Sequence, residues 1–289
     1  MTELVRMPVD GPFSLAAAAA FGFGPNTGRP LPGDGAAMRL VFVTDDLRHQ
    51  AGAAIRQEPG GGLVADVHGS ADVAAVERQL RRILSVDRPA DGWIAAGRRD
   101  PVLGRLQADH PGLRPVLFHS PYEAAAWAMM SQRRQRNQAA AMRRRVCEAL
   151  GRPFELDGQV DYAFPLPDRL LGLETFPGLE PRRVERLRGV AERALAGDLD
   201  PEMLASMETD RAMAALEAIP GLGPFYARSG PAPRLRRQRR THQRGTTAAR
   251  LPAPLLRAAG RARRCGGAPD RRGMAPVPNL GRGADPCVR

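Results

Sequence analysis

The chain lacks lysine altogether and contains few cysteines, and each shortage excludes a kind of chemistry. All 43 basic residues of this 289-residue sequence are arginines, so no lysine amine is present to form a Schiff base with a substrate. The three cysteines, Cys147, Cys265 and Cys287, are too few for an iron–sulfur cluster held by Cys₄ ligation. They also lack metal-ligand spacing, and so sparse and odd a set fits a reducing compartment.

Long hydrophobic runs are also missing. The first residues, MTELVRMPVDGPF, have no basic region followed by an apolar stretch, so they do not look like a signal peptide. The apolar stretch from Leu15 to Phe23 is too short and too rich in alanine to span a bilayer. We therefore expect a protein without membrane contact, located in the cytoplasm.

Acidic residues are scarce in only one part of the chain. The sequence holds 31 acidic residues and has a net charge of +12, but residues 228–289 contain 16 of the arginines and two of the acids. The first 227 residues hold 27 arginines and 29 acids, and are therefore close to neutral. The positive charge belongs to the last segment, so it does not show that the folded part binds nucleic acid.

Patterns typical of strands occur in the first part of the chain. Pro- and Gly-rich stretches separate three segments that we predict to be strands, over residues 13–23, 36–45 and 62–68. After the third, apolar residues recur at helical spacing, at Val73, Val76, Leu80 and Ile83. Residues 1–88 are therefore predicted to form a small β-rich domain, in which one helix packs on a sheet.

Beyond Pro89 the strand patterns stop, and residues 89–227 are predicted to form an all-α domain. Its second helix begins with a capping box, in which the Ser120 hydroxyl and the Glu123 carboxylate can each satisfy an unpaired amide. Trp127 in this helix is most simply a core residue, with a ligand pocket as the alternative. The predicted helices cover residues 93–109, 121–150, 167–173, 181–196, 201–207 and 211–218. With a disordered basic tail over residues 228–289, the sequence predicts an α+β fold.

The most informative stretch is the turn Ile219-Pro220-Gly221-Leu222-Gly223, which lies between two predicted helices. Gly221 and Gly223 lack side chains, so the turn can take left-handed angles and its amides can approach another backbone. These amides would lie at the positive end of the following helix dipole, which favours an anion. Such a turn fits one phosphate of a DNA strand and reads no base. An ordinary turn between helices is the alternative.

Four features follow one another along the chain. The first is the β-rich N-terminal domain. The second is the run FHSPYEAAAW, which leads into Ser131-Gln132-Arg133. The third is FPLP at residues 164–167, and the fourth is the hairpin. In this order they resemble the helix-hairpin-helix DNA glycosylase superfamily, and within it the DNA-3-methyladenine glycosylase II type. The resemblance covers nearly all of residues 1–227.

The resemblance implies roles for individual residues. The residues at and just after Gln132 would enter the DNA where the base has left, which puts Arg133 at the wedge position. Many relatives carry an apolar residue there, but an arginine can also fill the gap and contact phosphate. Trp127 and Phe225 would line the cleft that receives the flipped base. The phosphate would be bound by the hairpin residues Gly221, Leu222, Gly223 and Phe225.

The implied activity is base-excision repair of alkylated purines such as 3-methyladenine, by hydrolysis of the N-glycosidic bond. The partner would be double-stranded DNA containing damaged bases, and we expect a monomer associated with the nucleoid. Relatives that also cut the backbone use a lysine amine, so this chain is expected to be monofunctional. We expect no metal and no cofactor, apart from a monovalent cation that could bind at the hairpin.

The family's catalytic carboxylate is expected about twenty residues past the hairpin, near Arg244 and Gly245, but no acid occurs from Arg228 to Pro269. No catalytic residue is therefore assigned, and the chain as written is expected to be inactive. Reading each tail codon one base later permits an acidic turn between two helices, so we suspect a shifted reading frame after Ala227. The alternative is a natural basic tail that, with the hairpin, makes a non-catalytic DNA-binding protein. A weaker third possibility is a hairpin that binds a protein partner.

Overall fold

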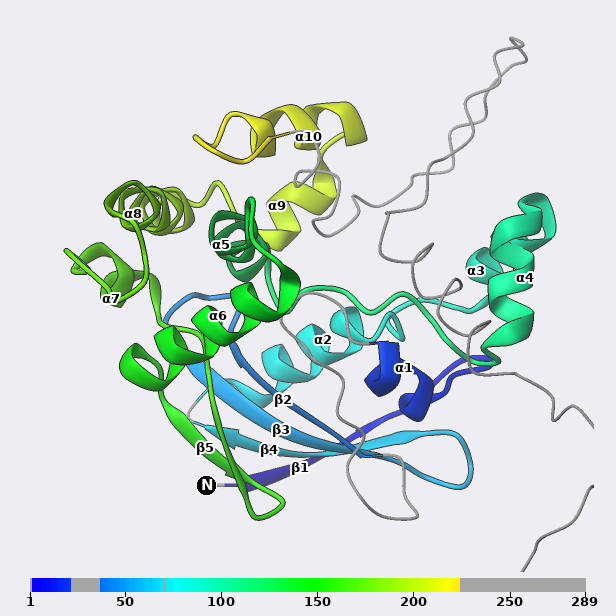
Figure 1. The fold of residues 1–289 in the computed structure, drawn as a ribbon. Helices are drawn as coiled ribbons and strands as arrows, with labels where there is room; N and C mark the ends of the chain where they lie inside the picture. Colours follow the sequence, from blue (N-terminus) through cyan, green and yellow to red (C-terminus); the bar gives the residue numbers. More distant parts are fainter. Residues whose placement is uncertain (1, 22–36, 70, 224–289) are drawn as a thin grey trace, which may run out of the picture.

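Four antiparallel strands form a sheet at the base of the protein in the computed structural model, which describes residues 2–21, 37–69 and 71–223 (Figure 1). The strands lie in the order β1-β4-β3-β2, and every neighbouring pair is antiparallel. Met38, Leu40 and Phe42 are buried on one face of β2, as their alternation indicates. The strands are Thr2–Met7 (β1), Ala37–Val43 (β2), Gln50–Gln57 (β3) and Leu63–Gly69 (β4).

The sequence patterns missed strands β1 and β3. Strand β3 lies between β4 and β2, and its residues from Gln50 to Ile55 are all buried. The run Ala51-Gly52-Ala53-Ala54 has little strand propensity because it lacks β-branched side chains. Small residues are nevertheless needed here, since a Cβ added to Gly52 would lie 2.9 Å from Phe154 Cδ1. The small residues of β3 are therefore explained by packing against Phe154, which is remote in the sequence.

Two helices, α1 (Leu15–Phe21) and α2 (Val73–Ile83), lie on the face of the sheet that is turned toward the other helices (Figure 1). The prediction of a strand over residues 13–23 is wrong for α1. Ser14 Oγ accepts a hydrogen bond from the Ala17 amide at 3.1 Å, and five alanines follow Leu15. A capping serine before the best helix-forming residue favours a helix. Helix α2 is confirmed, with Val76, Leu80 and Ile83 fully buried.

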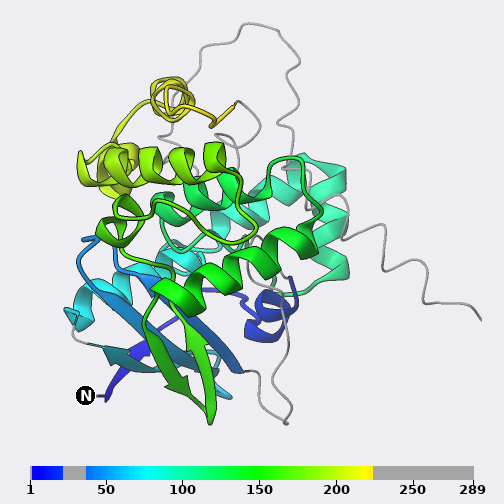
Figure 2. The ribbon, with the colours of Figure 1, turned by 60° about the vertical axis from the view of Figure 1, so that its left-hand side comes forward.

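A two-stranded β-hairpin interrupts the helical part of the chain and corrects the expectation that residues 89–227 are all helical. Strands β5 (Pro153–Leu156) and β6 (Gln159–Tyr162) pair through the turn Asp157-Gly158, in which both residues have positive φ. Asp-Gly is a strong signal for such a turn, but the strands have only four residues each. Figure 2 shows the hairpin against the sheet, where Phe154 and Leu156 pack with Ala54.

The predicted helix over residues 93–109 is two helices, α3 (Asp91–Arg99) and α4 (Pro101–Asp109). Asp100 separates them with extended backbone angles, as expected for a residue that precedes proline. Its carboxylate caps α4 by accepting hydrogen bonds from the amides of Val102 and Leu103, at 2.9 and 3.1 Å. The two helices project beside each other from the body of the protein (Figure 1).

The predicted helix over residues 121–150 is also divided, into α5 (Pro121–Ser131) and α6 (Arg136–Leu150). Ser120 caps α5 as predicted, since its Oγ accepts a hydrogen bond from the Glu123 amide at 3.2 Å. The Glu123 carboxylate, however, does not complete the capping box. It accepts a hydrogen bond from the Val43 amide of β2 at 2.9 Å, and so joins the sheet to α5.

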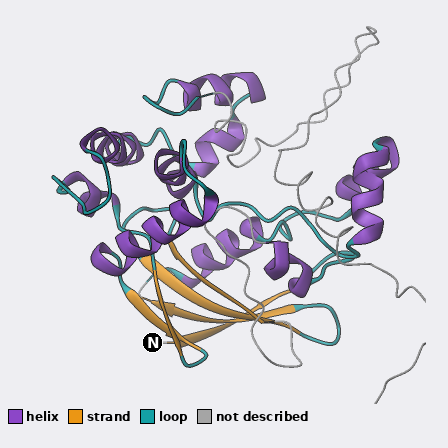
Figure 3. Ribbon diagram, in the orientation of Figure 1, coloured by secondary structure: helices purple, strands orange, loops and turns teal. Residues whose placement is uncertain are grey.

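The remaining helices complete an α-helical layer above the sheet (Figure 3). Residues of α5, α6 and α8 form most of its core, together with Phe164, Ile219 and Leu222. The Phe164-Pro165 segment connects the layers, because Gln50 Nε2 donates to the Phe164 carbonyl and Tyr122 donates to the Pro165 carbonyl. The helices are α7 (Pro167–Leu171), α8 (Pro181–Leu195), α9 (Pro201–Ser206) and α10 (Thr209–Glu217).

The α+β class is thus confirmed, with helices predominating over one small sheet and one hairpin in the described ranges. Within the same ranges, no helix is both long enough and apolar enough to cross a bilayer. Phe225 and the basic segment of residues 228–289 lie outside the described residues.

Candidate nucleic-acid interface

The hairpin turn follows α10 and is anchored by its two apolar residues. Ile219 and Leu222 are buried in the helical core. The Leu222 amide donates to the Ile219 carbonyl at 2.9 Å, so this amide is used within the turn. The phosphate-binding role of Leu222 stays a prediction. Gly221 is partly exposed and Gly223 is exposed, and within the described residues neither of their amides has a protein acceptor.

Gly221 is required by its conformation and by its surroundings. Its φ is +91°, in the left-handed region where a side chain is unfavourable. A Cβ at this position would lie 3.1 Å from Met129 Sδ and 3.2 Å from Arg186 Cδ. The turn therefore fits closely against the end of α5 and the side of α8.

Gln132, at the end of α5, contacts the hairpin turn directly. Its Nε2 donates to the Gly221 carbonyl, and its Oε1 accepts a hydrogen bond from Arg186 Nη1 at 2.9 Å. The structure thus brings together Gln132 and Gly221, which are 89 residues apart in the chain. Both polar atoms of the Gln132 side chain therefore have partners within the protein, and its entry into DNA stays a prediction.

Arg133 follows Gln132 and is exposed. Its φ is +54°, a left-handed conformation that costs a non-glycine residue about 1 kcal/mol. This conformation ends α5 and points the chain into α6 without any glycine or proline. Of the two residues assigned to the wedge, Arg133 is exposed and Gln132 is partly exposed.

The carbonyl groups at the end of α5 are bound by α8. Arg183 Nη1 donates to the Met129 carbonyl and Arg183 Nη2 donates to the Gln132 carbonyl, both at 2.8 Å. The last carbonyls of a helix lack partners within the helix, so this guanidinium satisfies two of them. The sequence does not single out Arg183 and Arg186, because arginines on an amphipathic helix give no signal that distinguishes them from solvated charges.

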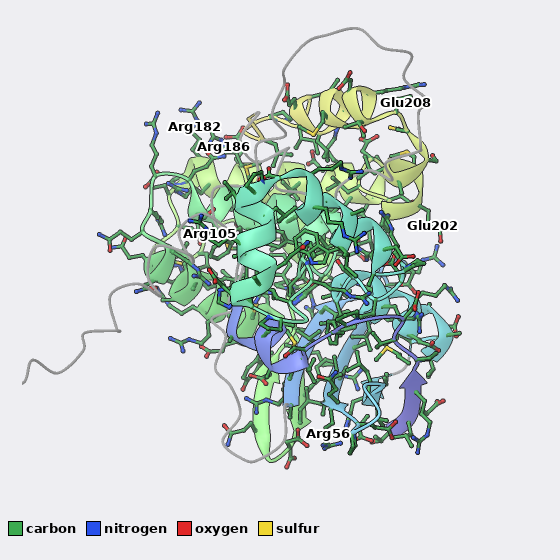
Figure 4. All side chains as sticks on the ribbon, turned by 90° about the vertical axis from the view of Figure 1, so that its right-hand side faces the viewer. Arg56, Arg105, Arg182, Arg186, Glu202 and Glu208 are labelled. Carbon is green, nitrogen blue, oxygen red and sulfur yellow. The ribbon has the colours of Figure 1, made fainter. Side chains whose placement is uncertain are left out.

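The labelled arginines of α4 and α8 and the labelled glutamates of the helical layer lie on different sides of the molecule in Figure 4. Figure 4 shows Arg182 and Arg186 of α8 on one side, while Glu202 and Glu208 lie on the other. Arg105 of α4 lies on the same side as the two α8 arginines (Figure 4). The hairpin contact places Gln132 and Gly221 beside Arg186. Arg186 therefore brings a positive charge to the contact between these two turns.

Trp127 lies in α5 with 8% of its surface exposed. It packs with Phe118 and Ala139 in a small cluster apart from the main helical core. These contacts agree with the simple interpretation of Trp127 as a packing residue. Its proposed partner in a base pocket, Phe225, lies outside the described residues.

A buried ionic group fixes the beginning of α5. Glu123 Oε2 accepts a hydrogen bond from Arg143 Nη2 at 2.7 Å and lies 3.1 Å from His119 Nδ1, while Oε1 binds the Val43 amide. Burial alone would raise the pKa of Glu123, but His119, Arg143 and the Val43 amide lower this pKa to about 2. The carboxylate is therefore ionised at neutral pH and connects the sheet, α5 and α6.

The position expected for the catalytic carboxylate, near Arg244 and Gly245, lies outside the described residues. The described residues therefore include the elements expected to recognise DNA. They do not include the position expected for the catalytic carboxylate.

Known proteins that are similar to this chain are DNA glycosylases. No protein family profile matches the sequence. The chain is 23% identical over 156 residues to a DNA-3-methyladenine glycosylase of Bacillus subtilis (strain 168), in an alignment that covers 53% of this chain and 52% of that protein. The chain thus spans about half the length of the curated relative that it matches.

Two solved structures share the fold over most of the chain. The first is a 3-methyladenine DNA-glycosylase from Archaeoglobus fulgidus, with a TM-score of 0.60, 22% identity and 77% of each chain covered. The second is an 8-oxoguanine glycosylase/lyase from Clostridium acetobutylicum in its apo form, with a TM-score of 0.54, 17% identity and 80% of each chain covered. The described part of this chain therefore shares its fold with these two DNA glycosylases.

Proposed function

We propose that this protein is a DNA glycosylase of base-excision repair, whose partner is double-stranded DNA containing damaged bases. The observation that carries the proposal is the contact between Gln132 and the Gly221 carbonyl. This contact holds the turn of residues 132–135, which contains Arg133, beside the turn of residues 219–223. The second turn is suited to a DNA phosphate. The glycosylase fold and the Arg186 guanidinium at this contact support the assignment.

The proposed substrates are alkylated purines such as 3-methyladenine. Two of the similar proteins are named as 3-methyladenine glycosylases. Alkylation makes the purine a cationic leaving group, so hydrolysis breaks the bond from the sugar C1′ to the base while water bonds to C1′ and releases its proton to solvent. A damaged base is also the least costly to flip. Trp127 and Phe225 would favour its cationic ring through cation–π attraction.

We propose base removal without strand cleavage. The similar Clostridium acetobutylicum enzyme is named a glycosylase/lyase, and lyase chemistry in this superfamily uses a lysine amine as nucleophile. The sequence of this chain contains no lysine. We further propose a monomer, associated with the nucleoid in the cytoplasm, that needs no cofactor apart from a monovalent cation that could bind at the hairpin.

The chain as written is proposed to release little or no base. A carboxylate is needed to stabilise the oxocarbenium-like sugar and to assist water, and no acid occurs from Arg228 to Pro269. A reading frame shifted after Ala227 would explain why the resemblance to the family stops at that point.

The test combines an assay of base release with sequencing of the codons around Ala227. Methylated duplex DNA is incubated with the chain as written and with a chain whose tail is translated one base later, and free 3-methyladenine is measured. Release by the shifted-frame chain alone is the expected result. Robust release by the chain as written would overturn the proposal that it is inactive. Release by neither chain, with no preference for damaged duplex, would overturn the glycosylase assignment.

A second candidate function is a non-catalytic DNA-binding protein that uses the hairpin and the arginines of residues 228–289. The observation that favours it is the presence of 16 arginines and two acids in this segment. Binding of this kind would weaken steeply with salt, because each arginine that neutralises a phosphate releases counterions. Deletion of residues 228–289 would then abolish binding, whereas the glycosylase proposal expects damage-selective binding to remain.

A further inference from the structure

We propose that Arg183 and Arg186 of α8 are positioning residues, which hold the turn of residues 132–135 against the hairpin turn of residues 219–223. The two turns would then contact DNA as one rigid surface. This inference rests on the proposed function. It assigns to α8 the role of holding the two turns in a fixed relative position.

The first part of the arrangement is the bidentate contact of Arg183. Its two terminal nitrogens donate to the carbonyls of Met129 and Gln132, both at 2.8 Å, and 11% of its side chain is exposed. A guanidinium is planar and can donate to two carbonyls at once, which a lysine ammonium does less well. Arg183 therefore fixes the backbone at the end of α5. It also fixes Gln132, the residue that precedes the exposed Arg133.

The second part is the chain of contacts from Arg186 to the hairpin. Arg186 Nη1 donates to Gln132 Oε1 at 2.9 Å, and Gln132 Nε2 donates to the Gly221 carbonyl. The Arg186 Cδ also lies 3.2 Å from the position of a Cβ on Gly221. Arg186 thus orients the Gln132 side-chain amide by donating to its oxygen. The aliphatic part of Arg186 packs on the hairpin turn, to which the Gln132 amide nitrogen donates.

The two contacts come from residues one helical turn apart on α8, since positions i and i+3 lie on the same face. Val184 and Leu187 between and beside them are buried in the core, so the backbone of α8 cannot shift easily relative to α5. A rigid support reduces the entropy that is lost when both turns are ordered on DNA. Its loss should therefore weaken the distinction between damaged and intact DNA more than it weakens general attraction to phosphate.

The experiment measures this distinction in the full chain. Two duplexes are used, one with a tetrahydrofuran abasic-site analogue next to 2-aminopurine and one intact, and the dissociation constants are compared at the same salt concentration. Arg186→Ala is expected to reduce the preference for the abasic duplex by about tenfold. It should also reduce the rise in 2-aminopurine fluorescence that reports unstacking by the wedge.

The matched control is Arg188→Ala, which removes the same charge from the same helix. Arg188 is exposed and has no hydrogen-bond or ion-pair partner within the described residues. This variant should keep both the preference and the fluorescence change. A second test variant, Gln132→Glu, keeps a partner for Arg186 but removes the donor to the Gly221 carbonyl, and it should lose the preference while it remains folded in urea titrations.

The outcomes separate the inference from the proposed function. If the wild type prefers the abasic duplex and both Arg186→Ala and Gln132→Glu retain that preference, the positioning role is overturned and the glycosylase assignment stands. If the wild type binds both duplexes equally, both proposals are overturned. A loss of preference in these two variants, with Arg188→Ala unchanged, supports both.

Discussion

Neutralising Glu123 should destabilise the fold strongly at neutral pH and only weakly in acid. The change is Glu123→Gln, which keeps the size of the side chain and an oxygen that can accept from the Val43 amide, but removes the charge opposite Arg143. Only 1% of the Glu123 side chain and 12% of the Arg143 side chain are exposed. Removing one partner of a buried pair leaves the other charge uncompensated, which is costly.

The magnitude follows from the pKa of Glu123, which is about 2 in the folded protein against an ordinary value of 4.5. The difference corresponds to about 3 kcal/mol in favour of the ionised form in the folded state. Because the folded-state pKa is the lower one, this stabilisation is fully present above pH 4.5. It is lost as the pH falls from 4.5 to about 2.

The assay is urea unfolding of the wild type and Glu123→Gln from pH 7 to pH 2.5. We expect a difference in unfolding free energy of about 3 kcal/mol at pH 7 that shrinks steadily below pH 4.5. Glu185→Gln, at an exposed position of α8, is the control and should differ little from the wild type. A difference that is small at pH 7, or that stays constant across the pH range, would refute the account of Glu123.

Three further predictions concern single features of the chain. Gly221→Ala should lower the unfolding free energy by about 1–2 kcal/mol in urea titrations, because φ is +91° and the added Cβ meets Met129 and Arg186; an unchanged midpoint would contradict this. Asp100→Ala should cost about 1 kcal/mol by removing the cap of α4, and thermal melts in which Asp100→Asn loses as much would count against capping. Deleting residues 228–289 should reduce the slope of log affinity against log salt for intact duplex, and an equal slope would show that these arginines do not contact DNA.

The sequence predicted those elements whose signals are local. The alternation of Met38, Leu40 and Phe42 and the helical spacing of Val76 and Leu80 reflect burial on one face, and both were confirmed. Strand β3 depends instead on contact between Gly52 and Phe154, which lie about a hundred residues apart in the sequence. No local pattern reports such a contact, and small residues weaken the usual strand signal.

The boundaries within helices show the same distinction. Asp100-Pro101 is a local signal that marks the break between α3 and α4, although it lies inside a longer stretch of helical periodicity. The break at Arg133 has no such signal, since the run Gln132-Arg133-Arg134-Gln135 contains neither glycine nor proline. It is stabilised by Arg183 from α8, which only the folded structure brings near.

The candidate site was predicted in part. The turn at Gly221 and the segment at Gln132 were recognised through the resemblance to a family, and their direct contact is seen in the structure. The Leu222 amide is used within the turn, and the Gln132 side chain is used against the hairpin. Both hydrogen bonds depend on the three-dimensional arrangement and leave no trace in the order of residues.

The most direct test of the central claim is the affinity of Gly223→Leu for duplex DNA that contains the tetrahydrofuran analogue. Gly223 is exposed and no described atom lies within 4 Å of an added Cβ, so the fold should tolerate the side chain while a phosphate is kept away from the turn. We predict affinity about tenfold or more weaker than that of the wild type, with the same unfolding free energy. Unchanged affinity would contradict the claim that this hairpin binds DNA.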